Sequence, residues 1–227
     1  MAGSLAARAT LRASLSTRLA RRSSELRVYM SAEYRHLILM ARRPAFGLGK
    51  RRLAAGVGNL VAHRFQKFAL AHLLRDLAAD PRWRLWLALT PDRPLRLPGA
   101  RRVIAQGGGD LGVRMQRLSG GLPSGAVVFI GSDTPQVNRG DIAAAFSALG
   151  RADAVFGPAR DGGYWLIGFT QAQRRRLPFS DVRWSTRHTR ADTLKNLTGK
   201  RVEMLRELED VDDAESYARW REVRVEG

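Results

Sequence analysis

The chain has 227 residues, of which 44% are hydrophobic, and these values suit one domain with a sizeable core. It carries 39 Lys and Arg against 21 Asp and Glu, a formal charge of +18. Cysteine is absent, which excludes disulfides and thiolate metal sites and is compatible with a reducing cytoplasm. No apolar run approaches the roughly 20 residues of a membrane-spanning helix. We therefore expect a soluble, cytoplasmic protein without a transmembrane segment.

The positive charge would ordinarily suggest a nucleic-acid or anionic-membrane partner. Only four of the basic residues are lysine (Lys50, Lys67, Lys195 and Lys200), and the arginines are spread along the whole chain. No zinc-finger, RNP-type or basic-zipper pattern accompanies them. We expect an anionic small substrate and no specific nucleic acid.

Residues 1–34 are predicted to form a basic, poorly ordered N-terminal extension, followed by a single domain over residues 35–227. The first thirty residues are rich in Arg, Ser and Ala and lack the apolar segment of a secretory signal. Their composition resembles that of a transit peptide. They also fit a tail that folds only on a surface, or residues that precede a translation start at Met30.

Beyond Met30, apolar runs that alternate with segments of helical spacing predict an α/β protein. In chain order we expect a strand at 36–41, a helix over 59–80, strands at 83–90 and 101–106, a helix at 111–118, a strand at 125–133, a helix at 138–150, strands at 152–159 and 162–169, a helix at 186–199, an extended segment at 201–208 and a last helix at 212–223. This alternation indicates a three-layer α/β/α sandwich with a mostly parallel sheet. In such sheets ligands bind at the carboxyl ends of the strands.

Asp133 lies at such a place, directly after the apolar run "VVFIGS". Gly131 lets the backbone approach a ligand, and Pro135 ends the strand pairing. A carboxylate here suits a hard cation such as Mg²⁺ or Mn²⁺. The alternative is that Asp133 caps the turn or the following helix.

Six motifs carry a resemblance to a known family. "GKRRLA", "QGGGDLGVRM", "GSDTP", "GPARDGGYWLIG", "RWSTRHTRADTL" and "LEDVDDAESY" follow one another between about residues 36 and 220. Their order resembles a bacterial family of glycosyltransferase-like proteins of the radical-SAM/selenodomain-associated transferase type. The resemblance implies the nucleotide-diphospho-sugar transferase (GT-A-like) fold and kinship with molybdenum-cofactor guanylyltransferases.

The resemblance implies a metal site that holds Mg²⁺ or Mn²⁺. Asp133 matches the metal-binding aspartate of this fold, and Asp212 resembles the second metal-side aspartate, with Asp210 as a neighbouring candidate. Asp212 followed by Glu215 three residues later is also a capping-box pattern for the last helix.

Lys50 and Arg52 are implied to bind the phosphates of a nucleotide from the predicted loop after the first strand. Many relatives carry Lys-Thr-Arg-Leu there, whereas this chain carries Lys-Arg-Arg-Leu.

The "QGGGD" and "DGGY" motifs supply the other predicted binding residues. Glycines let a backbone pass close to a flat base or sugar, and a simple loop is the alternative. Arg114 could contact phosphate or pair with Asp110 across one helical turn. The match of Asp161 to the family's "DGGY" motif implies that it faces the donor sugar or the acceptor, and in an enzyme that inverts at the sugar carbon it is the predicted general base for the acceptor hydroxyl. A structural Asp-Gly turn is the alternative. The predicted substrate-binding residues are Gln106, Gly108, Asp110, Arg114, Gly162, Gly163 and Tyr164.

The prediction is thus a metal-dependent transferase that uses a nucleotide-activated donor. Sugar transfer from a nucleotide-diphospho-sugar to a small-molecule acceptor is favoured. Nucleotidyl transfer from a nucleoside triphosphate is the alternative, and a non-catalytic nucleotide- or nucleic-acid-binding module is the third hypothesis.

Overall fold

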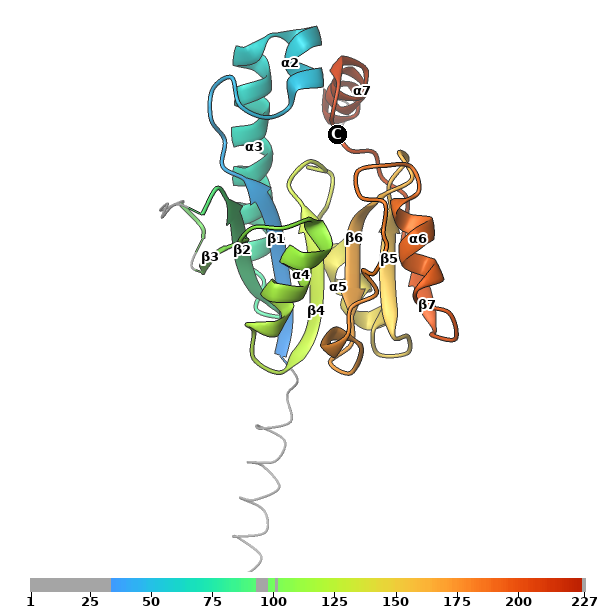
Figure 1. Cartoon of the computed structure of the whole chain (residues 1–227). Helices are drawn as coiled ribbons and strands as arrows, with labels where there is room; N and C mark the ends of the chain where they lie inside the picture. Colours follow the sequence, from blue (N-terminus) through green and yellow to red (C-terminus); the bar gives the residue numbers. More distant parts are fainter. Residues whose placement is uncertain (1–33, 93–97, 101, 226–227) are drawn as a thin grey trace, which may run out of the picture. The chain divides into compact units, whose positions relative to one another are not determined.

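The structure, a computed structural model, describes residues 34–92, 98–100 and 102–225. The predicted N-terminal extension lies outside the described residues, apart from Tyr34. Within them, seven strands form one sheet in the order β3-β2-β1-β4-β6-β5-β7 (Figure 1). The strands are β1 (Tyr34–Arg42), β2 (Arg84–Thr90), β3 (Val103–Ala105), β4 (Gly125–Gly131), β5 (Ala154–Pro158), β6 (Tyr164–Phe169) and β7 (Val202–Met204).

The sheet is mixed but mostly parallel, as predicted. β1 pairs in parallel with β2 and with β4, and β2–β3 and β5–β7 are also parallel. β6 alone runs antiparallel to its neighbours β4 and β5. The helices are α2 (Arg51–Val57), α3 (Asn59–Ala78), α4 (Leu111–Gly120), α5 (Arg139–Ala148), α6 (Thr189–Lys195) and α7 (Ala214–Val225), with a short 3-10 helix, η1 (Gln173–Arg175).

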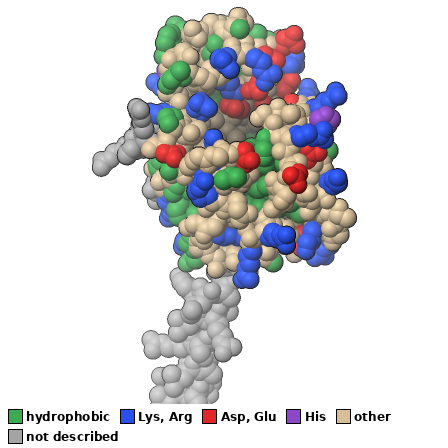
Figure 2. Space-filling view, viewed as in Figure 1, with side chains coloured by type: hydrophobic (Ala, Val, Ile, Leu, Met, Phe, Trp, Pro, Cys, Tyr) green, Lys and Arg blue, Asp and Glu red, His purple; other side chains and the backbone are tan. Residues whose placement is uncertain are grey.

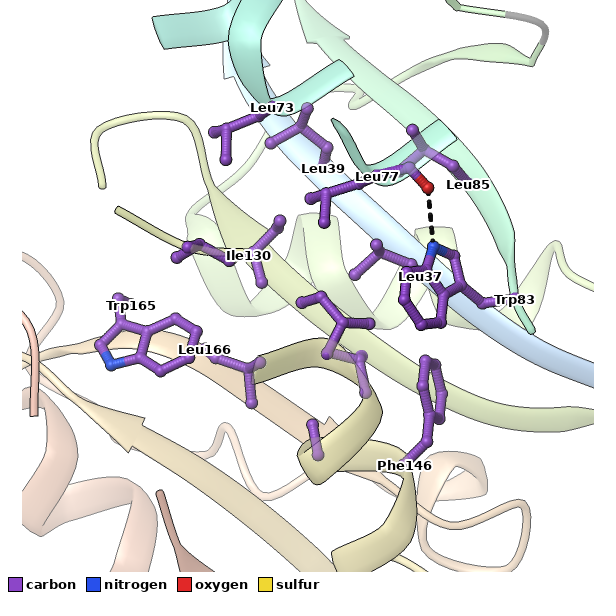
Figure 3. Packing of buried hydrophobic residues seen from close by; sticks show 14 of the residues in the cluster. Leu37, Leu39, Leu73, Leu77, Trp83, Leu85, Ile130, Phe146, Trp165 and Leu166 are labelled. Atoms are coloured by element: carbon purple, nitrogen blue, oxygen red, sulfur yellow. Dashed lines mark hydrogen bonds between the residues drawn. The ribbon is translucent and has the colours of Figure 1, made fainter. Parts of the chain in front are cut away.

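Helices cover both faces of the sheet, which confirms the three-layer sandwich. On one face, α3 and α5 pack against β1, β2, β4 and β6, and Figure 3 shows Leu73, Leu77 and Phe146 of these helices among the buried strand residues. The indole Nε1 of Trp83 donates a hydrogen bond to the Leu77 carbonyl there, at 2.9 Å. On the other face, Met115 of α4 belongs to a second buried cluster that includes strand residues.

The side chains of β6 alternate between the two faces of the sheet. Trp165 is buried in the cluster beneath α3 and α5, whereas Tyr164 packs against the cluster beneath α4. Successive residues of a strand point to opposite faces of the sheet. The two aromatic residues therefore anchor opposite layers.

A third apolar cluster joins α2, α3 and α7. Leu53, Phe65 and Val211 are buried in it, and Tyr217 and Trp220 pack against them. Figure 1 shows α2, one end of α3 and α7 together beyond the ends of the strands. Residues of α2 and α3 line one side of the cavity described below.

The helix α2 corrects the prediction that Lys50 and Arg52 both lie in a loop. Arg52 is on α2, and only Lys50, at its N-cap, remains outside the helix. The helix is seven residues long, lacks an acidic first turn and has no side-chain cap. It is held by packing of Leu53 in the third cluster and by close contact of Gly56 with Ala214 on α7. Such tertiary support leaves no signal in a local pattern.

Among the described residues, no helix is both long enough and apolar enough to cross a membrane.

Candidate functional site

The order of the strands in the sheet reverses at β1: β2 and β3 lie on one side of it, and β4 and the later strands lie on the other. This strand pairs in parallel with β2 on one side and with β4 on the other. In α/β sheets ligands bind outside the carboxyl ends of the strands at such a switch point. The register pairs Met40 with Gly131, so the residues that follow β1 and β4 leave the sheet side by side.

A cavity of about 660 Å³ lies at this place, within the roughly 300–1,000 Å³ of most ligand pockets. Apolar side chains such as Met40 and Leu70 line it together with charged ones. Figure 2 shows acidic and basic side chains next to a hollow in this face. The lining residues are Met40, Ala41, Arg42, Gly49, Lys50, Arg51, Arg52, Gln66, Leu70, Thr90, Gln106, Leu111, Gly131, Ser132, Asp133 and Asp212.

The cavity brings together five of the predicted site residues, namely Lys50, Arg52, Gln106, Asp133 and Asp212. Their positions in the sequence are far apart, and the fold makes them neighbours. The remaining predicted residues are not among the residues that line the cavity.

Lys50 connects two of the acidic residues. Its Nζ lies 3.0 Å from Asp133 Oδ1 and 2.6 Å from Asp212 Oδ1, and it donates to the Val211 carbonyl at 2.7 Å. We call this group the Lys50 bridge. Burial lowers the pKa of Lys50, but the charges and hydrogen bonds of the two aspartates outweigh it, so the pKa rises above its ordinary value. Lys50 therefore stays charged.

The side chain of Asp133 faces the cavity and is not a helix cap. It is 49% exposed, and Lys50 is its partner. The capping role proposed as its alternative belongs to Asn138, whose side chain accepts from the Gly140 and Asp141 backbone amides at the start of α5. The carboxylate of Asp133 is thus available to a ligand.

Asp212 is likewise free of the capping role that the sequence allowed. Ser216 donates its backbone amide to Asp213 Oδ1 at 2.9 Å, so Asp213 performs that role one residue later. The two carboxylate oxygens of Asp212 face Lys50 and Arg52, at 2.6 and 3.3 Å. The capping-box interpretation of Asp212 and Glu215 is wrong.

Asp210 is a partly buried aspartate two residues before Asp212. Its Oδ1 accepts a hydrogen bond from the Thr134 hydroxyl. Burial, together with the charges of Asp133, Asp161 and Asp212, raises the pKa of Asp210 to about 6, although the hydrogen bond from Thr134 lowers it. Strongly perturbed carboxyls are more frequent at functional sites than elsewhere.

Gln106 has a fixed orientation at the cavity. It is 4% exposed, and its Nε2 donates to the carbonyls of Ala41 and Ala88 at 3.1 and 2.8 Å. Its Oε1 has a weaker contact, with Arg114 Nη1 at 3.4 Å. This side chain therefore presents an acceptor rather than a donor.

The rest of the "QGGGD" loop has structural roles. Asp110 caps α4 by accepting from the Val113 amide at 2.8 Å. Arg114 donates to the Gly109 carbonyl at 2.9 Å instead of pairing with Asp110. The carbonyl of Gly108 accepts from Arg117 at 2.9 Å. The predicted contacts of these residues with substrate remain predictions.

The "DGGY" motif forms a turn whose residues do not line the cavity. Asp161 Oδ1 accepts from the Gly163 amide at 2.8 Å, as in the structural alternative. Gly162 has a φ of 88°, and a Cβ there would lie 2.3 Å from the Arg187 carbonyl oxygen, so glycine is required. Burial raises the pKa of Tyr164, although a hydrogen bond with the Thr193 side chain lowers it. Tyr164 is a core residue and not a wall of the cavity.

Sequence reasoning missed Arg42, Arg51 and Ser132 as lining residues. Arg42 is the last residue of β1, whereas the apolar pattern of the sequence predicts that this strand ends at Ala41. Ser132 follows the glycine that ends β4. The basic pair Arg42–Arg43 directly after a buried strand was the available signal.

Hard-cation chemistry fits the Lys50 bridge. Asp133 Oδ1, Asp212 Oδ1 and the Val211 carbonyl oxygen all lie within 3.0 Å of one point, which is the Lys50 ammonium. No group of three or more His, Cys, Asp or Glu side chains that could hold a metal occurs in the described part of the chain. Mg²⁺ commonly binds through one or two carboxylates, with substrate phosphates and water as the other ligands. The residues fit a metal of that kind.

The family model for DUF2064, described as an uncharacterized protein conserved in bacteria, matches residues 73–186. The chain belongs to the DUF2064 family. The matched residues include Gln106, Asp133 and Asp161, whereas Lys50 and Asp212 lie outside the match. No curated protein matches the chain.

Solved structures share the fold. A protein from Desulfovibrio desulfuricans G20, provisionally named a nucleotide-diphospho-sugar transferase, is 26% identical with a TM-score of 0.71, over 84% of this DUF2064 chain and 95% of that chain. The 4-diphosphocytidyl-2C-methyl-D-erythritol synthase from Anaerococcus prevotii DSM 20548 is 12% identical with a TM-score of 0.56, over 86% and 99% of the two chains. A cytidylyltransferase from Leptospira borgpetersenii is 14% identical with a TM-score of 0.53, over 82% and 84%. The similarity to the first structure confirms the predicted nucleotide-diphospho-sugar transferase fold.

Proposed function

We propose that this protein is a metal-dependent transferase that takes a sugar from a nucleotide-diphospho-sugar and passes it to a small-molecule acceptor. The observation that carries the proposal is the cavity at the switch point. Basic residues line this cavity, and the Asp133 and Asp212 carboxylates there share one ammonium partner, Lys50. The name given to the similar protein from Desulfovibrio desulfuricans G20 supports the same donor class. Kinship with radical-SAM-associated transferases or molybdenum-cofactor guanylyltransferases remains a prediction.

The charges of the cavity suit a diphosphate. Arg42, Arg51 and Arg52 line it and can contact phosphate oxygens, and Arg52 is 78% exposed. Neighbouring phosphate charges 4 Å apart repel by about 1 kcal/mol in water and by about 4 kcal/mol at an effective dielectric of 20. A partly closed cavity therefore needs positive charge on both sides of the diphosphate.

Asp133 and Asp212 are the residues that would hold Mg²⁺ or Mn²⁺. When bound, the ion neutralises the diphosphate and stabilises the charge that develops on the leaving group. Gln106 would accept a hydrogen bond from an N–H or O–H group of the donor. Asp161 remains the predicted general base, and its role requires the acceptor hydroxyl within about 3 Å.

Nucleotidyl transfer is the second candidate, because the structures from Anaerococcus prevotii and Leptospira borgpetersenii carry the names of cytidyl-transferring enzymes. In sugar transfer, an acceptor hydroxyl attacks the anomeric carbon, the bond from that carbon to the diphosphate oxygen breaks, and a nucleoside diphosphate leaves. In nucleotidyl transfer, a phosphate oxygen of the acceptor attacks the α-phosphorus, the bond to the bridging oxygen breaks, and pyrophosphate leaves. The leaving groups distinguish the two reactions.

The test incubates the protein, with Mg²⁺ or Mn²⁺, against panels of nucleotide-diphospho-sugars and nucleoside triphosphates. The products are assayed for nucleoside diphosphate and for pyrophosphate. Sugar transfer predicts release of the nucleoside diphosphate, and pyrophosphate release alone would favour the second candidate. Asp133→Asn should reduce the rate by at least about 100-fold. The matched control is Asp181→Asn, which changes an exposed aspartate outside the cavity and should leave the rate unchanged.

A further inference from the structure

The Lys50 ammonium lies between the two carboxylates proposed to hold the metal. Its partners are Asp212 Oδ1 at 2.6 Å, Val211 O at 2.7 Å and Asp133 Oδ1 at 3.0 Å. An ammonium group has three N–H donors, and these oxygens use all of them. The Lys50 side chain is only 7% exposed, so water has little access to it.

The same oxygens are the ligands that a hard cation requires. Mg²⁺ takes oxygen ligands at about 2.0–2.1 Å, and two carboxylates and a carbonyl already converge on one point in the Lys50 bridge. A divalent ion cannot occupy that point together with the ammonium, because the two cations would overlap and their charges repel. One of them has to leave.

The backbone holds Lys50 in this place. Lys50 has φ 45° and ψ 41°, in the left-handed region that residues other than glycine rarely adopt, and Gly49 before it has φ 81°. The four-carbon side chain is flexible, so its ammonium can move without a change in the backbone. Arg42, Arg51 and Arg52 line the same cavity. Phosphates bound by these arginines would offer the ammonium other oxygens.

We propose that Lys50 is a built-in counter-ion that competes with the divalent metal for Asp133, Asp212 and the Val211 carbonyl. The metal then binds tightly only when nucleotide phosphates draw the ammonium away. This inference rests on the proposed nucleotide-binding function. It makes nucleotide and metal binding mutually dependent, because each ligand raises the affinity for the other by the same factor.

The test measures Mn²⁺ binding to the full chain without nucleotide, by electron paramagnetic resonance of the free ion. Lys50→Met removes the charge and keeps a side chain of similar shape. We expect this variant to bind Mn²⁺ at least about tenfold more tightly than the wild type, which is about 1.4 kcal/mol. Lys50→Gln serves if the methionine variant fails to fold. Lys67→Met, at an exposed lysine on α3, is the matched control and should bind as the wild type does.

A double variant tests whether the additional Mn²⁺ affinity comes from Asp133. Adding Asp133→Asn to Lys50→Met should remove the gain in Mn²⁺ affinity. The inference is overturned if neither Lys50 variant binds Mn²⁺ more tightly than the wild type, or if the gain persists with Asp133→Asn. No nucleotide is present in this experiment, so its failure differs from failure of the proposed function, in which no nucleotide would bind the wild type.

Discussion

Asp210→Asn should stabilise the protein at neutral pH, although it replaces a hydrogen-bonded residue. Folding raises the pKa of Asp210 from 3.8 to about 6. A shift of about 2 units corresponds to about 3 kcal/mol. The Asp210 carboxyl binds its proton more tightly in the folded state, so folding is disfavoured once it ionises. The stability that its protonation contributes is present below pH 3.8 and is lost as the pH rises through about 6.

Asparagine keeps the oxygen that accepts from Thr134 and carries no charge. We therefore expect the variant to be more stable than the wild type by up to about 3 kcal/mol at pH 7.5 and by little at pH 4. The assay is urea unfolding between pH 4 and 8 in EDTA, so that no metal contributes. A variant that is less stable at pH 7.5, or whose difference from the wild type does not change with pH, would refute the electrostatic account.

Three further predictions concern the scaffold, each measured by chemical unfolding. Arg174→Met should cost at least about 3 kcal/mol, because this buried guanidinium donates to four backbone carbonyls that would all lose a charged donor, whereas Arg175→Met at an exposed position should cost little. Gly162→Ala should cost about 1–3 kcal/mol, because of its φ of 88° and the nearby Arg187 carbonyl, whereas Gly108→Ala, with open space around it, should cost much less. Burial, with the charge of Arg174, lowers the pKa of His36 from 6.5 to about 4. The neutral His36 side chain should therefore contribute to the free energy of unfolding above pH 6.5, and this contribution should be lost as the pH falls toward 4. His36→Gln in the Asp210→Asn background should flatten that slope; an unchanged slope would assign it to other groups.

The sequence predicted the layers of the fold because each layer has its own periodicity. The buried residues of α3 recur at helical spacing, and β4 is a continuous apolar run. The reversed direction of β6 does not follow from such patterns, because antiparallel pairing depends on the short turn at the "DGGY" motif. The sequence predicts an Asp-Gly turn there, but it does not predict that the strand after the turn runs antiparallel to β4 and β5.

The site could be predicted residue by residue but not as an arrangement. Asp133 is a candidate because of its place after the central strand, and the structure places its side chain at the cavity. The contact of Lys50 with Asp212 joins residues 162 positions apart, and it depends on the packing of α2, α3 and α7. Local patterns carry no record of this packing. They suggested a free phosphate-binding lysine, whereas the ammonium is occupied by two carboxylates.

We propose that Asp133 holds a divalent ion that binds a nucleotide's phosphates in this cavity. Isothermal titration with the nucleotide that most stabilises the protein in a thermal-shift panel, with and without Mn²⁺, tests it directly. We expect Mn²⁺ to raise nucleotide affinity at least about tenfold in the wild type and in Asp181→Asn, and Asp133→Asn to lose this gain. The same gain in Asp133→Asn, or no nucleotide binding in the wild type, would contradict it.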